Sequence, residues 1–223
     1  MPSRNLKKTI TMKHLFTALS LCLLLAACDM APSGDQNVET ALTLYDLEEY
    51  DAAKEELKIA AGRSLTIYEK ADVYNMLGNI ADDQEELDSA LYYYDLSLAE
   101  DPEQVTAWVN KGIIFRLQGD FDSAEACYLE AEARDPNDPE LLASMGALFL
   151  FRDNIEQSLA YLERSIKMDP SLAVAHSNYA IALAMDGRFE EADASLKMAV
   201  RKGYKNGEAA RERINELRAL YEE

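Results

Sequence analysis

The sequence predicts an all-α fold, an α-solenoid of stacked helix-turn-helix hairpins, and two regularities support this prediction. The dipeptide Asp-Pro recurs with a step of 34 residues, at Asp101-Pro102, Asp135-Pro136 and Asp169-Pro170. Small residues keep the same step, at Gly78, Gly112, Gly146 and Ala180. A repeat of this length is typical of helical hairpins that stack side by side into a superhelix.

Starting the repeat at Ala71 divides the chain into four frames, 71–104, 105–138, 139–172 and 173–206. Small residues let helices approach closely, and they stand at position 8 (given above), at position 20 (Ala90, Ala124, Ser158, Ala192) and at position 27 (Ser97, Ala131, Ser165, Ala199). Large residues fill the spaces between hairpins, and they stand at position 4 (Tyr74, Trp108, Leu142, His176) and at position 24 (Tyr94, Tyr128, Leu162, Leu196). Proline at position 32 blocks continuation of a helix, so it ends each frame except the last, which has Tyr204. Gly119 and Gly187 are expected in the turn inside a hairpin.

Two further segments complete the predicted array. A weaker copy of the pattern occupies 34–67, which makes five repeats within 37–206. The segment 207–223 is predicted to be a final helix that caps the array, as a solenoid requires. Its apolar face consists of Ala210, Ile214, Leu217 and Tyr221, and its arginines, Arg211, Arg213 and Arg218, are expected in solvent.

The 34-residue unit with these small and large positions resembles the tetratricopeptide repeat family. The resemblance implies a right-handed superhelix that binds a protein or peptide on its concave face, which the first helices line with positions 2, 5, 9, 12 and 13. Carried onto this chain, it implies a protein-binding groove formed by Asn75, Asn79, Asp82, Asp83, Val109, Ile113, Arg116, Leu117, Ala147, Leu150, Phe151, Ile181 and Met185. This groove is polar and acidic at its N-terminal end and apolar through the last three repeats.

Some members of the family hold a C-terminal carboxylate with a set of cationic residues, and that set is missing here. The corresponding positions hold Asn75, Glu140 and Ser144, although Asn79 and Asn110 match the asparagines of the clamp. An apolar helix or an extended peptide is therefore the expected occupant of the groove.

The N-terminal residues 1–27 have the features of a signal peptide, with four basic residues before an uncharged run from Leu15 to Ala27. The run ends in Leu25-Ala26-Ala27-Cys28, which resembles the lipobox of bacterial lipoproteins. Cys28 is therefore the predicted lipidation site, with palmitate among its acyl chains, and residues 28–36 are the predicted flexible tether. Either Met1 or Met12 serves as the start.

This segment predicts a location in the bacterial cell envelope, with the chain anchored to a membrane by its acylated N-terminus and facing the periplasm. Asp29 resembles an inner-membrane retention signal, but the choice between inner and outer membrane stays open. The net charge of −19 argues against nucleic acid as a partner, because phosphates require a basic surface.

Catalytic, metal and cofactor sites are not expected. Cys127 and His176 fall in different repeats at positions that favour packing over nucleophilic catalysis. The acidic run from Asp82 to Asp88 lacks the spacing of a calcium loop, and the chain has no glycine-rich phosphate loop.

These observations favour a non-enzymatic scaffold or adaptor. The chain resembles lipoproteins that assist assembly of an envelope machine such as a pilus or secretin. An adaptor that recruits peptidoglycan hydrolases or proteases is the alternative, and an enzymatic activity of the repeat array is a third hypothesis.

The lipobox assignment makes a direct prediction. Cys28→Ala should abolish acylation of the precursor, because the thiol is the group that accepts the lipid. Metabolic labelling with palmitate checks this, and continued labelling of the variant would contradict the lipoprotein assignment.

Overall fold

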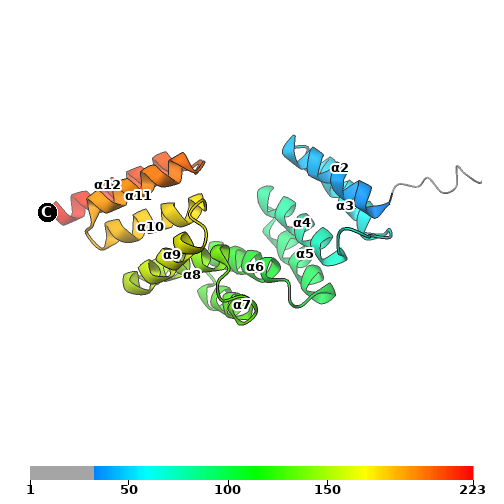
Figure 1. Ribbon diagram of the computed structural model, residues 1–223, viewed down its shortest axis with the longest axis horizontal. Coiled ribbons are helices and arrows are strands. Elements are labelled where there is room, and N and C mark those ends of the chain that lie inside the picture. Colours follow the sequence, from blue (N-terminus) through cyan, green and yellow to red (C-terminus); the bar gives the residue numbers. More distant parts are fainter. Residues whose placement is uncertain (1–32, 223) are drawn as a thin grey trace, which may run out of the picture. The chain divides into compact units, whose positions relative to one another are not determined.

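The computed structural model describes residues 33–222, and this part of the chain contains eleven α-helices and no strand (Figure 1). None of the helices in this range has both the length and the apolar character needed to cross a membrane. The predicted signal peptide and Cys28 lie outside the described residues. The described residues divide into two compact units, one that ends at Tyr68 and one that begins at Glu69.

Each predicted frame holds one helical hairpin. The first unit contains α2 (Gly34–Asp46) and α3 (Tyr50–Ala61). The second unit contains α4 (Lys70–Asp83), α5 (Leu87–Glu100), α6 (Val105–Leu117), α7 (Phe121–Arg134), α8 (Pro139–Phe151), α9 (Ile155–Met168), α10 (Ala173–Met185), α11 (Phe189–Arg201) and α12 (Gly207–Glu222).

The first helices of successive hairpins in the second unit stack as one layer. Helix α6 contacts α4 and α8, and α8 contacts α10. Helix α12 contacts both α10 and α11, so it takes the place that the first helix of a further hairpin would occupy. Ala210, Ile214 and Leu217 are buried in this contact, as the apolar face of the capping helix predicts.

The small residue at position 8 lies directly against the large residue at position 24 of the same hairpin. A Cβ atom added at Gly112 would lie 2.4 Å from the Tyr128 ring. Gly78 has the same relation to Tyr94, and at Gly146 the added atom would lie 2.5 Å from Leu162 Cγ. Real Cβ atoms do not approach so closely, so each of these contacts requires a glycine.

The aspartates of the Asp-Pro repeat close the turns between hairpins. The Asp101 carboxylate accepts a hydrogen bond from the amide of Glu103 at 3.0 Å. Asp135 and Asp169 accept the same bond from the amides two residues later, at 2.9 Å and 2.8 Å. Aspartate favours such turns because its short side chain reaches the backbone two residues further on.

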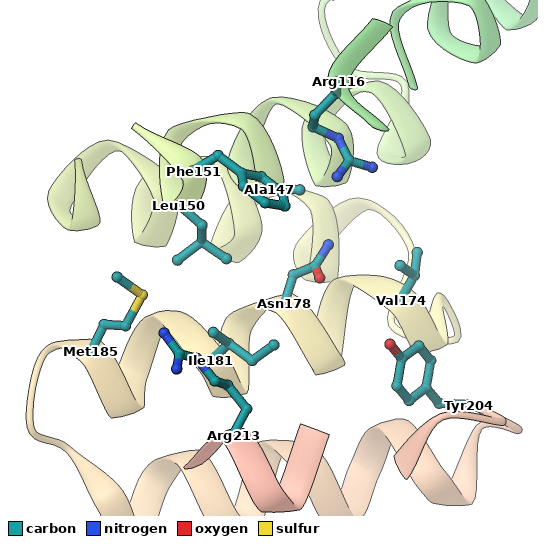
Figure 2. Close-up of a pocket in the computed structure, with 10 residues that line it drawn as sticks. All are labelled: Arg116, Ala147, Leu150, Phe151, Val174, Asn178, Ile181, Met185, Tyr204 and Arg213. Carbon is teal, nitrogen blue, oxygen red and sulfur yellow. The ribbon is translucent and has the colours of Figure 1, made fainter. Parts of the chain in front are cut away.

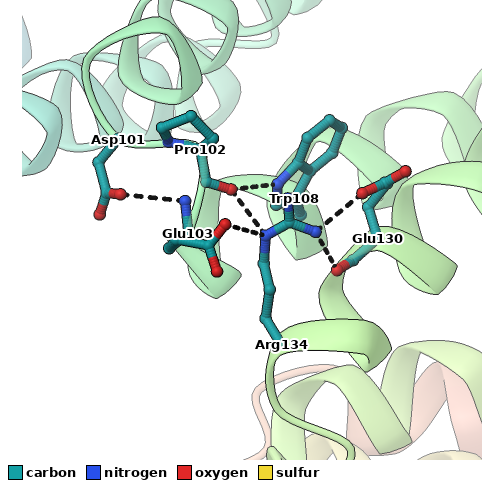
Figure 3. Close-up of polar contacts among 6 residues, drawn as sticks. All are labelled: Asp101, Pro102, Glu103, Trp108, Glu130 and Arg134. Carbon is teal, nitrogen blue, oxygen red and sulfur yellow. Dashed lines mark hydrogen bonds and ion pairs between the residues drawn. The ribbon is translucent and has the colours of Figure 1, made fainter.

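The carbonyl group of the following proline holds the next hairpin in place (Figure 3). The Pro102 oxygen accepts hydrogen bonds from Trp108 Nε1 at 3.0 Å and from Arg134 Nε at 2.7 Å. Arg134 also pairs with Glu130 at 2.8 Å and with Glu103 at 3.6 Å. Trp108, at position 4 of its frame, is therefore a hydrogen-bond donor to the turn as well as a packing residue.

The turn inside every hairpin contains one residue in the left-handed conformation, always at position 15. Gly119 and Gly187 have φ of 80° and 78°, as expected from the sequence. Glu48, Glu85 and Asp153 adopt the same conformation in the other three hairpins, with φ of 61°, 60° and 56°. Only two of the five turns were therefore marked by glycine in the sequence.

The boundary of the predicted tether requires a correction. Helix α2 begins at Gly34 rather than near Asn37, because Ser33 caps it by accepting a hydrogen bond from the amide of Gln36. Asp35 is buried and accepts bonds from the Thr66 hydroxyl at 2.6 Å and from the amides of Thr66 and Ile67. Residues 34–36 thus belong to the first hairpin.

The contact between positions 8 and 24 predicts the effect of a single methyl group. Gly112→Ala should lower the free energy of unfolding by about 1–3 kcal/mol, because the new Cβ overlaps the Tyr128 ring. Chemical denaturation checks this. Gly62→Ala is the control, because its Cβ would meet only the Ile59 carbonyl oxygen at 3.6 Å, and it should be neutral or stabilise by up to about 1 kcal/mol. Equal destabilisation by both changes would contradict the proposed contact.

The buried Asp35 carboxylate of the first hairpin predicts an acid transition. Hydrogen bonds, chiefly from the Thr66 hydroxyl, lower the pKa of Asp35 from 3.8 to about 2. The stabilisation is therefore fully present above about pH 4 and is lost as the pH falls towards 2. The hydrogen-exchange protection factors of the amides in α2 and α3, which correct for the intrinsic dependence of exchange on pH, measure this loss between pH 6 and pH 2.

Asp35→Asn should lower the protection factors of this hairpin at pH 6. It should also make these protection factors less dependent on pH. Unchanged exchange at pH 6 in the variant would rule out a stabilising role for the carboxylate.

Candidate functional site

Six of the predicted groove residues line one pocket of about 440 Å³ in the second unit (Figure 2). They come from three successive first helices: Arg116 from α6, Ala147, Leu150 and Phe151 from α8, and Ile181 and Met185 from α10. Because these helices stack as one layer, positions 9, 12 and 13 of adjacent frames meet. We call this cavity the inner pocket.

Four further residues complete the lining of the inner pocket. Val174 stands at position 2 of its frame, which the repeat pattern directs inward. Sequence reasoning missed the other three, Asn178, Tyr204 and Arg213. Tyr204 replaces the proline at position 32 of the last frame. This departure from the repeat was the one feature of the sequence that could have indicated a role for Tyr204 in the pocket. Arg213 lies on the capping helix, on the face that was expected in solvent.

The inner pocket has an apolar wall with large exposed side chains. Phe151 remains 59% exposed although it stacks on Phe121, with ring centroids 5.6 Å apart. Leu150, Ile181 and Met185 are half-buried beside it. Apolar side chains left open to solvent in one contiguous surface are typical of interaction sites.

Two arginines stand at opposite sides of this apolar wall (Figure 2). The Arg116 guanidinium lies 5.5 Å from the centroid of the Phe151 ring, and its Nε is buried without a hydrogen-bond partner in the described part of the chain. Arg213 pairs with Glu216 at 3.1 Å, and both side chains are more than half exposed. The pocket is therefore locally cationic in a chain whose net charge is −19.

Val109 does not belong to the exposed groove, and this corrects the sequence prediction. It is 1% exposed and packs with Leu141 and Met145 in the core between α6 and α8. Position 5 of this frame faces the next first helix rather than solvent. Ile113 is also packed against this core, and Leu117 is exposed but does not line the inner pocket.

The predicted polar end of the groove forms a separate network between α4 and α6. Asn79 accepts hydrogen bonds from the Tyr94 hydroxyl at 3.0 Å and from Asn110 Nδ2 at 2.9 Å. Asn110 also lies 3.4 Å from Asn75 Oδ1. These amides hold the two helices together, so their first role is structural.

The acidic residues at the end of α4 stand close to each other. Burial and then the charge of Asp83 raise the pKa of Asp82, whose side chain is half-buried, whereas Asp83 is exposed. Neither residue lines the inner pocket.

Cys127 and His176 have structural surroundings. Burial raises the pKa of the Cys127 thiol to about 11, so the thiol is protonated near neutral pH. His176 is buried, and its Nε2 lies 3.1 Å from the Pro170 carbonyl oxygen, the same turn contact that Trp108 makes. Within residues 33–222, no group of three acidic, histidine or cysteine side chains is arranged to hold a metal ion.

Comparison with family models identifies the repeat. One tetratricopeptide repeat model matches residues 38–105 and 145–207, and a second matches residues 105–138. The chain belongs to the tetratricopeptide repeat family. These matches and the helical hairpins together account for the 34-residue step of the sequence.

Relatives with curated descriptions match only part of this chain. The STIP1 homologue of Dictyostelium discoideum is 27% identical over 104 residues, which cover 47% of this chain and 18% of the relative. The ycf37 protein of Cyanophora paradoxa is 35% identical over 85 residues, which cover 38% and 49%. The chain thus spans less than half the length of either relative.

Solved tetratricopeptide repeat structures share the fold at low identity. TTC0263 from Thermus thermophilus has a TM-score of 0.67 at 17% identity, covering 83% of this chain and 98% of that one. A repeat protein from Parabacteroides merdae has a TM-score of 0.60 at 19% identity, covering 82% and 72%. YrrB, described as having an unusual peptide-binding site, has a TM-score of 0.50 at 20% identity, covering 68% and 78%.

Proposed function

We propose that this tetratricopeptide repeat protein is a scaffold that binds a segment of another protein in the inner pocket. The apolar wall formed by Leu150, Phe151, Ile181 and Met185 carries this proposal, because it presents a continuous unfilled surface on the stacked first helices. A volume of about 440 Å³ suits a few side chains of an extended or helical segment.

The family supports the same function. Tetratricopeptide repeats are in general protein-interaction modules, and YrrB, which has a similar fold, is described as having a peptide-binding site. The contacts of Cys127 and His176 also favour a structural role for the two side chains that were considered for catalysis.

The proposal extends to where the scaffold acts. We propose that Cys28 carries the lipid anchor, so that the repeats face the periplasm and assist assembly of an envelope machine such as a pilus or secretin. The support for this step is the signal-like composition of residues 1–27 and the sequence Leu25-Ala26-Ala27-Cys28.

A charge placed on the apolar wall tests the scaffold function. Phe151→Asp should weaken partner binding by on the order of 2 kcal/mol or more, because a large aromatic anchor is replaced by a charged group. The measurement is crosslinking capture of partners from membranes, followed by affinity measurement with the captured protein.

Leu129→Asp is the matched control, because Leu129 is 53% exposed on α7 and does not line the pocket. Both variants should keep the thermal stability of the wild type within a few degrees. Capture that is unchanged by Phe151→Asp would exclude the inner pocket as the binding site.

A further inference from the structure

We infer that the inner pocket selects a protein segment in which two acidic side chains flank an apolar side chain, with one carboxylate bound by Arg116. This inference rests on the proposed function and adds the chemistry of the partner to it. Three observations carry it: the unpaired Nε of Arg116, the apolar wall beside it, and the second arginine on the far side of that wall.

Arg116 has hydrogen-bonding capacity that the protein leaves unused. Its Nε is buried without a partner, and no ion pair of Arg116 occurs within residues 33–222. Burial raises the pKa of the nearby Tyr128 hydroxyl, and the positive charge of Arg116 beside it acts in the opposite direction. Buried donors without acceptors are costly, and a guanidinium binds a carboxylate through two parallel hydrogen bonds.

The position of this guanidinium is held by packing. Arg116 lies over the Phe151 ring, and that ring stacks on Phe121 of α7. Figure 2 shows the Arg116 side chain from α6 and the Asn178 amide from α10 directed into the same side of the pocket. Asn178 therefore stands where it can donate to the carboxylate or to the backbone of a bound segment.

The apolar wall determines which type of side chain the partner carries next to the carboxylate bound by Arg116. Leu150 and Ile181 face each other across the pocket, and Met185 adjoins them (Figure 2). An unbranched thioether adapts to side chains of different shape, so this wall accepts leucine, isoleucine, methionine or phenylalanine. The wall specifies an apolar side chain adjacent to the bound carboxylate.

Arg213 on α12 can bind a second acidic side chain of the partner. Its ion pair with Glu216 joins side chains that are 53% and 64% exposed, and such exposed pairs contribute little stability. A partner carboxylate can therefore compete with Glu216 for Arg213. A chain terminus supplies only one carboxylate, so two arginines on either side of an apolar wall fit internal aspartate or glutamate residues better.

Charge also separates this partner from other occupants. A basic segment, including the chain's own residues Arg4, Lys7 and Lys8, would be repelled by both arginines. A long polyanion would be repelled by the surrounding acidic surface, since the whole chain has a net charge of −19. A short acidic and apolar segment satisfies the pocket without covering that surface.

The test uses the purified full chain and synthetic fluorescent peptides with acetylated N-termini. One amidated set places glutamates on both sides of one to three leucines, and matched amidated sets carry glutamine or lysine instead of glutamate. A further set carries glutamine and a free C-terminal carboxylate. Fluorescence anisotropy should show the glutamate set binding about tenfold or more tightly than the glutamine set, and the lysine set binding least.

Variants assign this preference to the two arginines. Arg116→Gln should weaken binding of the glutamate set about tenfold and leave the glutamine set unchanged. Arg213→Gln, at an exposed position, should weaken the glutamate set severalfold without altering the thermal melt. Arg201→Gln is the control, because Arg201 is exposed and does not line the pocket, and it should bind like the wild type.

Each other outcome overturns a defined part of the inference. Equal binding of the glutamate and glutamine sets would refute acid recognition and leave the apolar scaffold function standing. Preference for the free-terminus set would replace the internal acids by a chain end. Self-association in sedimentation that is lost in Arg116→Gln would make a second copy the occupant. Binding of no peptide set would count against the proposed function as well.

Discussion

The contact between a bare backbone at position 8 and a large side chain at position 24 governs the architecture of the second unit. At Gly112 and Gly78 a tyrosine ring occupies the space that a Cβ would need, and at Gly146 a leucine does so. The two helices of each hairpin therefore pack at their closest distance. This close packing repeats from α4 to α9, so the inward faces of the first helices recur in register, and the inner pocket depends on that register.

The turns between hairpins transmit this register along the chain. The two residues of an Asp-Pro pair have different roles. The aspartate side chain accepts a hydrogen bond from the amide two residues later within the same turn. At Pro102 and Pro170 the proline carbonyl accepts a hydrogen bond from the side chain at position 4 of the next hairpin. The strongest pattern in the sequence is thus explained by two hydrogen-bond acceptors in addition to the helix-breaking ring. The same contact explains the histidine at position 4 of the last frame. The imidazole of His176 contacts the Pro170 carbonyl as the indole of Trp108 contacts the Pro102 carbonyl.

Periodicity predicted the fold and much of the site, and its failures have physical causes. Seven lining residues of the inner pocket, Val174 among them, stand at positions that the repeat directs inward. Tyr204 and Arg213 were missed because they lie at the end of the array, where the periodic pattern stops. Val109 was assigned to the groove wrongly, because adjacent first helices touch and bury position 5 between them. Ser33 and Gly34 suggested a flexible linker by composition, whereas capping and close approach make them the start of a helix.

The left-handed residue at position 15 has a consequence for how this protein could change over time. The backbone conformation alone makes the turn, and Glu48, Glu85 and Asp153 adopt it at a steric cost of about 1 kcal/mol each. Their side chains are exposed and have no packing role, so substitutions between glycine and acidic residues are tolerated at these positions. Because they lie in separate hairpins, glycine at each would add stability independently. The array therefore holds a reserve of stability that could offset destabilising changes in the inner pocket as its specificity evolves.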